Sequence, residues 1–303
     1  MIYTVTLNPS IDYIVRLETL DIGSVNRMTS DAMYVGGKGI NVSRILKRLG
    51  QNSTATGFLG GFTGDFIAQG LSQEGIKTAF VSVNQDTRIN VKIKADAETE
   101  INGSGPEVTQ PQLAELSTLL SSVTARDIVV FAGSAPTSLG NQIYQHLISL
   151  VRETGAQVVC DFEGQTLLEV LAYQPLLVKP NNHELAAIFG VSLTGIDDII
   201  IYARKLLTRG AKHAIISMAG DGALLVTSDS CYFAKPIKGQ VKNSVGAGDS
   251  MVAGFTGEFV RSGDALEAFK WGVACGTATA FSDDLARLDF IKEIYQQVEV
   301  EKR

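Results

Sequence analysis

The stretch from Lys242 to Ser250 places two glycines and one carboxylate directly before an apolar segment with helical spacing. Gly246 and Gly248 allow a tight turn and close approach of a ligand to the backbone. The first N–H groups of the following helix lack partners within it, and the helix dipole adds partial positive charge, so the turn suits a phosphate. Asp249 would repel that phosphate unless it takes a proton from an attacking hydroxyl. The alternative is that Asp249 only caps the helix.

A second glycine cluster, Gly36-Gly37-Lys38-Gly39-Ile40-Asn41, also opens a segment with helical spacing. Its glycines permit close approach of a ligand, its lysine supplies a cation, and its asparagine offers a two-sided amide for hydroxyl groups. The alternative is a plain strand-to-helix turn with a solvated lysine.

Two better-known phosphate motifs are excluded at these clusters. The dinucleotide pattern G-x-G-x-x-G requires glycine at position 251, where the chain has Met251. The P-loop pattern requires glycine at 32 and Ser or Thr at 39, where the chain has Ala32 and Gly39. A nucleotide would therefore bind by another route.

Composition excludes several classes of function. The chain has 303 residues and a net charge of −6, whereas nucleic acids and anionic membranes require a basic face. Cys160, Cys231 and Cys275 are far apart and match no metal spacing, which predicts reduced thiols in a cytoplasmic protein. The first residues lack a basic leader, no stretch of about 18 apolar residues could span a membrane, and three scattered histidines give no metal cluster.

Alternating strand and helix patterns predict one α/β domain, residues 1–303, whose central sheet is mostly parallel with helices on both faces. The predicted strands are 2–7, 54–59, 80–83, 127–132, 156–161, 176–178 and 213–218, followed by a hairpin at 222–234. The predicted helices are 39–49, 65–74, 110–122, 139–154, 164–172, 182–189, 196–209, 247–262, 264–281 and 287–297. Polar clusters at 8–12, 133–136, 179–184 and 217–223 follow strands. Ligands bind at the carboxyl ends of such strands, which favours the catalytic interpretation of Asp249.

Residues 88–102 differ from their surroundings, because strict alternation of apolar and polar residues predicts a half-exposed strand that turns back as a hairpin. Together with 13–17 and 24–35 it is expected to form a small antiparallel sheet outside the main body. We expect this β lid, about 12–36 and 86–104, to cover the ligand site and exclude water. Its apolar outer face predicts a homodimer through the lid.

The two glycine clusters together resemble the two signatures of the ribokinase-like, or PfkB, carbohydrate kinases, and the resemblance covers essentially the whole chain. Four further segments, 6–12, 87–91, 179–184 and 243–246, resemble the branch of the family that phosphorylates phosphosugars. The block from Thr99 to Pro106 resembles enzymes that act on fructose 1-phosphate. The resemblance implies a ribokinase-like fold and transfer of a phosphoryl group from ATP, with Mg²⁺, to D-fructose 1-phosphate. Phosphorylation of tagatose 6-phosphate and a non-catalytic sugar-phosphate or nucleotide sensor are the alternatives.

The resemblance also implies roles for individual residues. Asp249 would be the base, and Gly246, Ala247 and Gly248 would form the anion hole for the transferring phosphoryl group. The sugar would be bound by Asp12, Gly37, Lys38 and Asn41, and its phosphate by Arg88, Arg27 and Asn90. Asn181 and Glu184 would govern Mg²⁺ through water. The ATP site would comprise Lys179, Asn181, Ser217, Met218, Ala219, Gly220, Asp221 and Gly222, with Gly248 and Asp249.

One position departs from the family pattern. Many members have Asp where this chain has Asn243, but the phosphosugar branch commonly has Asn. Local structural roles remain as alternatives for single residues. Arg88 and Arg27 could be solvated, Asp12 could cap a turn, and Glu184 could be a first-turn charge favoured by the helix dipole.

Overall fold

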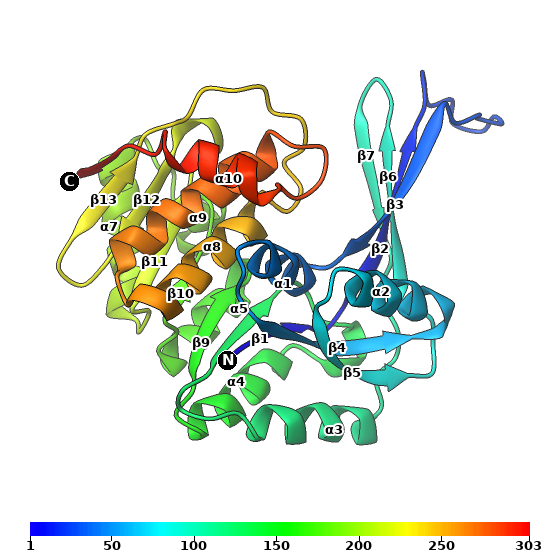
Figure 1. Ribbon diagram of the computed structural model, residues 1–303, viewed down its shortest axis with the longest axis horizontal. Helices are drawn as coiled ribbons and strands as arrows, with labels where there is room; N and C mark the ends of the chain where they lie inside the picture. The colour runs from blue at the N-terminus through cyan, green and yellow to red at the C-terminus, as the bar shows by residue number, and fades with distance from the viewer.

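The computed structural model describes residues 1–303 and consists of a ten-stranded sheet with helices on both faces and a separate four-stranded sheet (Figure 1). This confirms the predicted α/β architecture. In the large sheet, three strands at one edge (residues 223–226, 231–234 and 300–302) run antiparallel to their neighbours, and the other seven strands run parallel to one another. In spatial order the large sheet comprises β14 (Val300–Lys302), β13 (Cys231–Ala234), β12 (Ala223–Val226), β11 (His213–Ser217), β10 (Leu177–Val178), β9 (Gln157–Asp161), β8 (Ile128–Ala132), β1 (Ile2–Thr6), β4 (Ser53–Gly60) and β5 (Lys77–Val83).

Strand β8 shows why the parallel strands appear in the sequence as continuous apolar runs. Val129 and Phe131 pack into the core on one face of the sheet, and Ile128 and Val130 pack into the core on the other. A strand that is buried on both faces has no polar alternation.

The helices divide between these two cores. The first face is covered by α3 (Gln110–Ser121), α4 (Ile143–Glu153), α5 (Gly164–Val170), α6 (Asn182–Phe189) and α7 (Ile196–Thr208). The second is covered by α1 (Lys38–Arg48), α8 (Ala247–Ser262), α9 (Ala265–Ala280) and α10 (Leu288–Tyr295). Helix α2 (Gly61–Gln73) contributes to a third, smaller core between the two sheets, which also contains Ile11 and Ile40.

The large sheet and its helices differ from the sequence prediction at several element ends and in one strand. Helix α2 begins at Gly61 rather than at residue 65, and β5 begins at Lys77 rather than at residue 80. The helix expected from residue 139 begins at Ile143, because a short 3₁₀ turn, Thr137–Leu139, ends at Gly140 with φ of 71°. Strand β14 was not predicted. It has three residues, and its pairing with β13 joins segments that are far apart in the chain.

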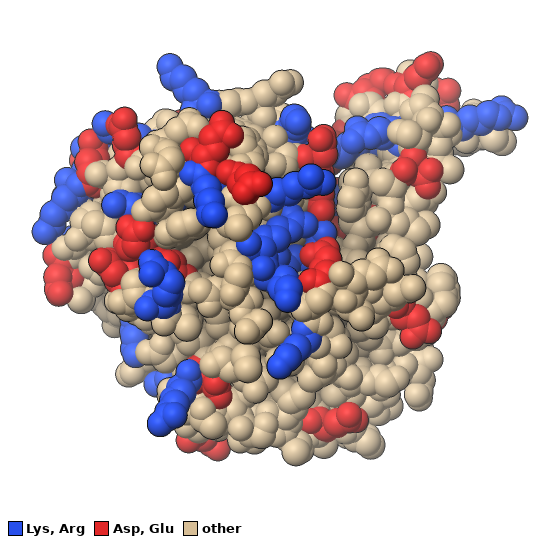
Figure 2. Space-filling view, viewed as in Figure 1, with Lys and Arg blue, Asp and Glu red and all other residues tan.

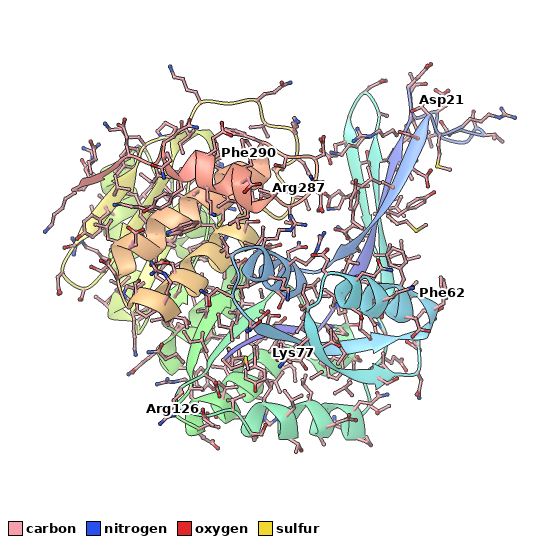
Figure 3. The ribbon with its side chains drawn as sticks, in the orientation of Figure 1. Asp21, Phe62, Lys77, Arg126, Arg287 and Phe290 are labelled. Atoms are coloured by element: carbon pink, nitrogen blue, oxygen red, sulfur yellow. The ribbon has the colours of Figure 1, made fainter.

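The smaller sheet projects from the main body and has the order β3 (Ser30–Gly36), β2 (Ser10–Arg16), β6 (Arg88–Lys94) and β7 (Glu98–Asn102) (Figure 1). The β6–β7 hairpin matches the prediction for 88–102. Both outer pairs are antiparallel, whereas the central β2–β6 pair is parallel. Residues 24–29, expected within a strand, belong to the β2–β3 connection, in which Asp21 marks the far end (Figure 3).

Helices α8 and α9 pack closely because glycines lie at their contact. A Cβ atom at Gly254 would lie 2.5 Å from the carbonyl oxygen of Trp271, and one at Gly276 would lie 3.1 Å from that of Ala247. No helix of the protein is both long and apolar enough to cross a membrane.

We therefore expect Gly254→Ala to lower the free energy of unfolding by about 1–3 kcal/mol, the usual cost of overpacking a core, despite the better helix propensity of alanine. Chemical denaturation measures this change. Val260→Ala, at a half-exposed position of the same helix, is the control and should change stability by less than about 0.5 kcal/mol. Equal stability of the Gly254 variant and the wild type would contradict the packing argument.

Candidate active site

A cavity of about 950 Å³ lies between the large sheet and the small sheet. The surface is visibly hollowed between the main body and the projecting sheet (Figure 2). Residues at or just beyond the carboxyl ends of neighbouring parallel strands line its floor: Asn8, Gly133, Asp161, Lys179 and Ser217. This is the place where open α/β sheets bind ligands.

Most of the residues implicated by the sequence line this cavity. They are Asp12, Gly37, Lys38, Asn41, Arg88, Asn90, Lys179, Asn181, Glu184, Ser217, Gly246, Gly248 and Asp249. Ala247 lies between two lining glycines without lining the cavity itself.

Besides Ala247, six of the implicated residues lie outside the cavity lining. Arg27 is exposed in the β2–β3 connection, which extends away from the main body. Met218, Ala219, Gly220, Asp221 and Gly222 form the turn that follows β11, beside Ser217. Their placement depends on how far each connection reaches, which local sequence patterns do not describe.

Asp249 is the third residue of α8, and the N-cap is Gly246 with φ of 78°, so capping does not explain the carboxylate. Its side chain is 6% exposed and accepts a hydrogen bond of 2.9 Å from Nδ2 of Asn41. Burial, reinforced by the nearby Asp161, raises the pKa of Asp249 to about 6, against the opposing effects of Asn41, Lys38 and Lys179. A carboxylate with this pKa is well matched to accept a proton near neutral pH.

Asp161 organises two cations beside Asp249, and the sequence analysis did not identify it. Its carboxylate lies 3.3 Å from Nζ of Lys179 and 3.7 Å from Nζ of Lys38. Although burial opposes ionisation, the two ammonium groups hold the pKa of Asp161 below its ordinary value. Asp161 in turn raises the pKa of Lys38. The available signal was a charged residue ending an otherwise apolar strand.

The start of α8 combines two sources of positive potential. A Cβ atom at Gly248 would lie 3.0 Å from Nζ of Lys179, so the absence of a side chain leaves room for the ammonium group beside the first turn. The unpaired N–H groups of that turn add their own partial charge. This arrangement suits an anion such as a phosphoryl group.

Asn181 and Glu184 cap helix α6 reciprocally, with hydrogen bonds of 2.8 Å in each direction between side chain and backbone. Glu184 therefore has a structural role at the start of the helix, which the sequence offered as an alternative. This role uses only Oε2 and leaves Oε1 without a protein partner. The protein has no cluster of three or more His, Cys, Asp or Glu side chains that could enclose a metal. The residues fit Mg²⁺ held mainly by substrate phosphates and water, with one or two protein oxygens.

The small sheet supplies the opposite wall. Arg88 donates to the carbonyl oxygens of Asn8 at 3.2 Å and Gly103 at 2.9 Å, and burial lowers the pKa of its guanidinium. Asp12 accepts from Nδ2 of Asn90 at 3.2 Å. Lys92 lines the same wall, but the sequence analysis did not identify it. The available signal was its alternation with Arg88 and Asn90 along the same strand.

Comparison with known proteins adds independent evidence. The profile of the pfkB family carbohydrate kinases matches residues 5–286. A 1-phosphofructokinase of Bacillus subtilis (strain 168) is 48% identical over 300 residues, covering 99% of both chains. A tagatose-6-phosphate kinase of Staphylococcus epidermidis is 32% identical over 307 residues, also covering 99% of both.

Among solved structures, a putative phosphofructokinase from Staphylococcus aureus superposes with a TM-score of 0.90 at 44% identity, covering 100% of this chain and 99% of the other. The family profile spans most of the chain and covers both glycine clusters, which meet in the cavity wall through the hydrogen bond between Asn41 and Asp249. The chain belongs to the pfkB family of carbohydrate kinases.

Proposed function

We propose that the protein transfers the γ-phosphoryl group of ATP to D-fructose 1-phosphate, giving fructose 1,6-bisphosphate and ADP. The observation that carries this proposal is the buried Asp249 at the start of α8, in the same cavity as Arg88 of the small sheet. The name of the Bacillus subtilis relative supports the choice of substrate.

The proposed reaction requires positioning and charge neutralisation more than covalent catalysis by the protein. The hydroxyl on carbon 6 of the sugar forms a bond to the γ-phosphorus while the bond to the β–γ bridging oxygen breaks and ADP leaves. Asp249 accepts the hydroxyl proton. Gly246, Ala247 and Gly248 would offer backbone N–H groups to the transferring phosphoryl group, that of Ala247 by exchanging its 3.3 Å hydrogen bond to the carbonyl oxygen of Ser244, and Lys179 adds a cation beside them.

We assign the phosphate already on the sugar to Arg88 and Asn90, because two phosphate groups close together would repel. Arginine also suits a bidentate grip on phosphate. Asp12, Gly37, Lys38 and Asn41 would then contact the sugar between the two phosphates. All six residues line the cavity.

We place the nucleotide along Lys179, Asn181 and Ser217, with its outer part toward the turn from Met218 to Gly222. Glu184 and Asn181 would hold Mg²⁺, in part through water, and the ion would neutralise charge on the nucleotide phosphates. Because ATP is the donor and the three cysteines are free thiols, we propose a cytoplasmic location.

The two alternatives to this proposal are phosphorylation of tagatose 6-phosphate and a non-catalytic sensor. Tagatose 6-phosphate also has a phosphate at one end and a hydroxyl at the other, and the Staphylococcus epidermidis relative is named for it. A non-catalytic sensor would not require a base. Asp249 is buried and accepts a hydrogen bond only from Asn41, which favours a kinase over a sensor.

We further propose that the small sheet, within a single domain, acts as a lid that excludes water from the phosphoryl group, and that its outer face forms a homodimer. Met33, Ile89 and Ile101 are 51%, 38% and 58% exposed. Their register places them beside Tyr13 and Val91 on the face opposite Asp12 and Asn90. Apolar side chains gathered on one exposed face mark an interaction surface.

If Asp249 is the base, kcat/KM should rise with pH through about 6 and then level off, because only the ionised carboxylate accepts a proton. Asp249→Asn should lower kcat by about 10²–10⁴ and remove this pH dependence. Steady-state ADP release between pH 5 and 8 measures both effects, with ATP binding as the control for folding. Retention of more than half of the wild-type kcat would exclude Asp249 as the base.

The substrate assignment predicts that kcat/KM for fructose 1-phosphate exceeds that for tagatose 6-phosphate and fructose 6-phosphate by at least about tenfold. Unphosphorylated fructose should be far poorer, because it leaves the half-buried Arg88 without its anion. Arg88→Ala should remove much of the preference for a phosphorylated sugar. A coupled ADP-release assay over these sugars measures this. Preference for tagatose 6-phosphate would change the substrate but leave the mechanism intact.

The dimer proposal predicts that light scattering at micromolar concentration gives twice the mass of the 32.4 kDa chain. Ile101→Lys should shift the protein toward monomer, because a charge would be buried in the interface. Ile201→Lys, at a 53% exposed position on α7, is the matched control and should leave the mass unchanged. A monomeric wild type would contradict the proposal.

A further inference from the structure

Lys92 is an unexplained buried cation in the wall of the active-site cavity. It is 6% exposed, and its Nζ lies 3.4 Å from Oδ2 of Asp12 and 3.9 Å from Oε1 of Glu100. Strand register places Lys92 opposite Glu100, and Asp12 on the same face beside Asn90. The polar face of the small sheet therefore holds a cluster of three charged groups, Asp12, Lys92 and Glu100.

Stability alone does not account for this cluster. Removing charges from water is costly, and well-packed apolar residues often replace a buried ion pair without loss of stability. An ammonium group has three hydrogens to donate. Asp12 lies within range of one, whereas Glu100 at 3.9 Å is beyond hydrogen-bonding distance. Donor capacity therefore remains at a cavity-lining position.

The position of Lys92 on β6 places it near the middle of the proposed substrate. Arg88, Asn90 and Lys92 follow one another along the cavity face of β6, with steps of about 6–7 Å. Asp12 and Lys92 also line a smaller adjoining cavity together with Asn41 and Val245, which belong to the Asp249 side of the site. The cluster therefore lies between the groups that we assign to the two ends of the sugar phosphate.

We propose that Lys92, with Asp12 and Glu100, binds the hydroxyl groups on the middle carbons of the sugar phosphate and determines which ketose is accepted. The inference rests on the proposed function. Lys92 donates to a hydroxyl oxygen, and the two carboxylates accept from hydroxyl hydrogens. Fructose 1-phosphate and tagatose 1-phosphate differ only in configuration at carbon 4, so this cluster should distinguish them.

The test compares Lys92→Met with Lys94→Met. Lys94 lies on the same strand and pairs with Glu98 at 3.7 Å; it borders the smaller adjoining cavity but does not line the active-site cavity. For Lys92→Met we expect kcat/KM for fructose 1-phosphate to fall about 10- to 100-fold, mainly through KM, the size expected when a charged hydrogen bond is lost. Its preference for fructose 1-phosphate over tagatose 1-phosphate should shrink to within about threefold, while KM for ATP changes less than about twofold. Lys94→Met should match the wild type, and Lys92→Arg should recover part of the loss.

Thermal unfolding shows whether Lys92→Met is folded. If it is not, Glu100→Gln on the exposed strand β7 replaces it and should weaken the same preference. Unchanged KM and an unchanged preference in a folded variant would overturn the inference, as would a wild type that does not distinguish the two epimers. If the wild type phosphorylates neither sugar, the proposed substrate is wrong, and the same KM comparison is made with the sugar phosphate that it does use. An unchanged KM there also overturns the inference.

Discussion

The active site depends on burying a carboxylate, Asp249, at the positive end of a helix without neutralising it. Burial and the neighbouring Asp161 both favour the protonated form, whereas Asn41 and two ammonium groups favour the ionised form. The balance leaves a pKa of about 6, so the group is ionised at neutral pH yet remains basic enough to accept a proton. Asp161 contributes to both sides of this balance, because it repels Asp249 and also holds Lys38 and Lys179 in place.

Side chains of helix α1 link the two glycine clusters through direct contacts. Near its start Asn41 donates to Asp249, and one turn later Arg44 binds Asp284 at 2.9 Å and Glu74 at 2.8 Å. The loop that carries Asp284 also carries Leu285, against which a Cβ atom at Gly246 would lie at only 2.7 Å. Cationic side chains gather over α1 in Figure 2. The same helix therefore holds the side chain of Asp249 and, through this loop, supports the turn at Gly246.

The two faces of the small sheet have different physical demands. The cavity face carries charges and amides, for which a polyol phosphate offers hydrogen-bonding partners. The opposite face carries exposed Met33, Ile89 and Ile101, for which a second apolar surface would remove the contact with water. Because successive side chains of a strand point to opposite faces, the same four short strands present a polar face to the cavity and an apolar face on the other side.

The sequence by itself determined the fold class and the two glycine turns, because strand periodicity, helix periodicity and the need for positive φ are properties of consecutive residues. Gly246 shows this directly, with φ of 78° at the N-cap of α8. Only the tertiary structure decided which distant groups meet. Asn41 and Asp249 are 208 positions apart, and Asp161 joins the site through the order of strands in the sheet. Lys92 contacts Asp12 diagonally across the parallel pair of β2 and β6. Arg27 lies outside the cavity for the same reason, since the reach of a loop depends on packing rather than on local residue types.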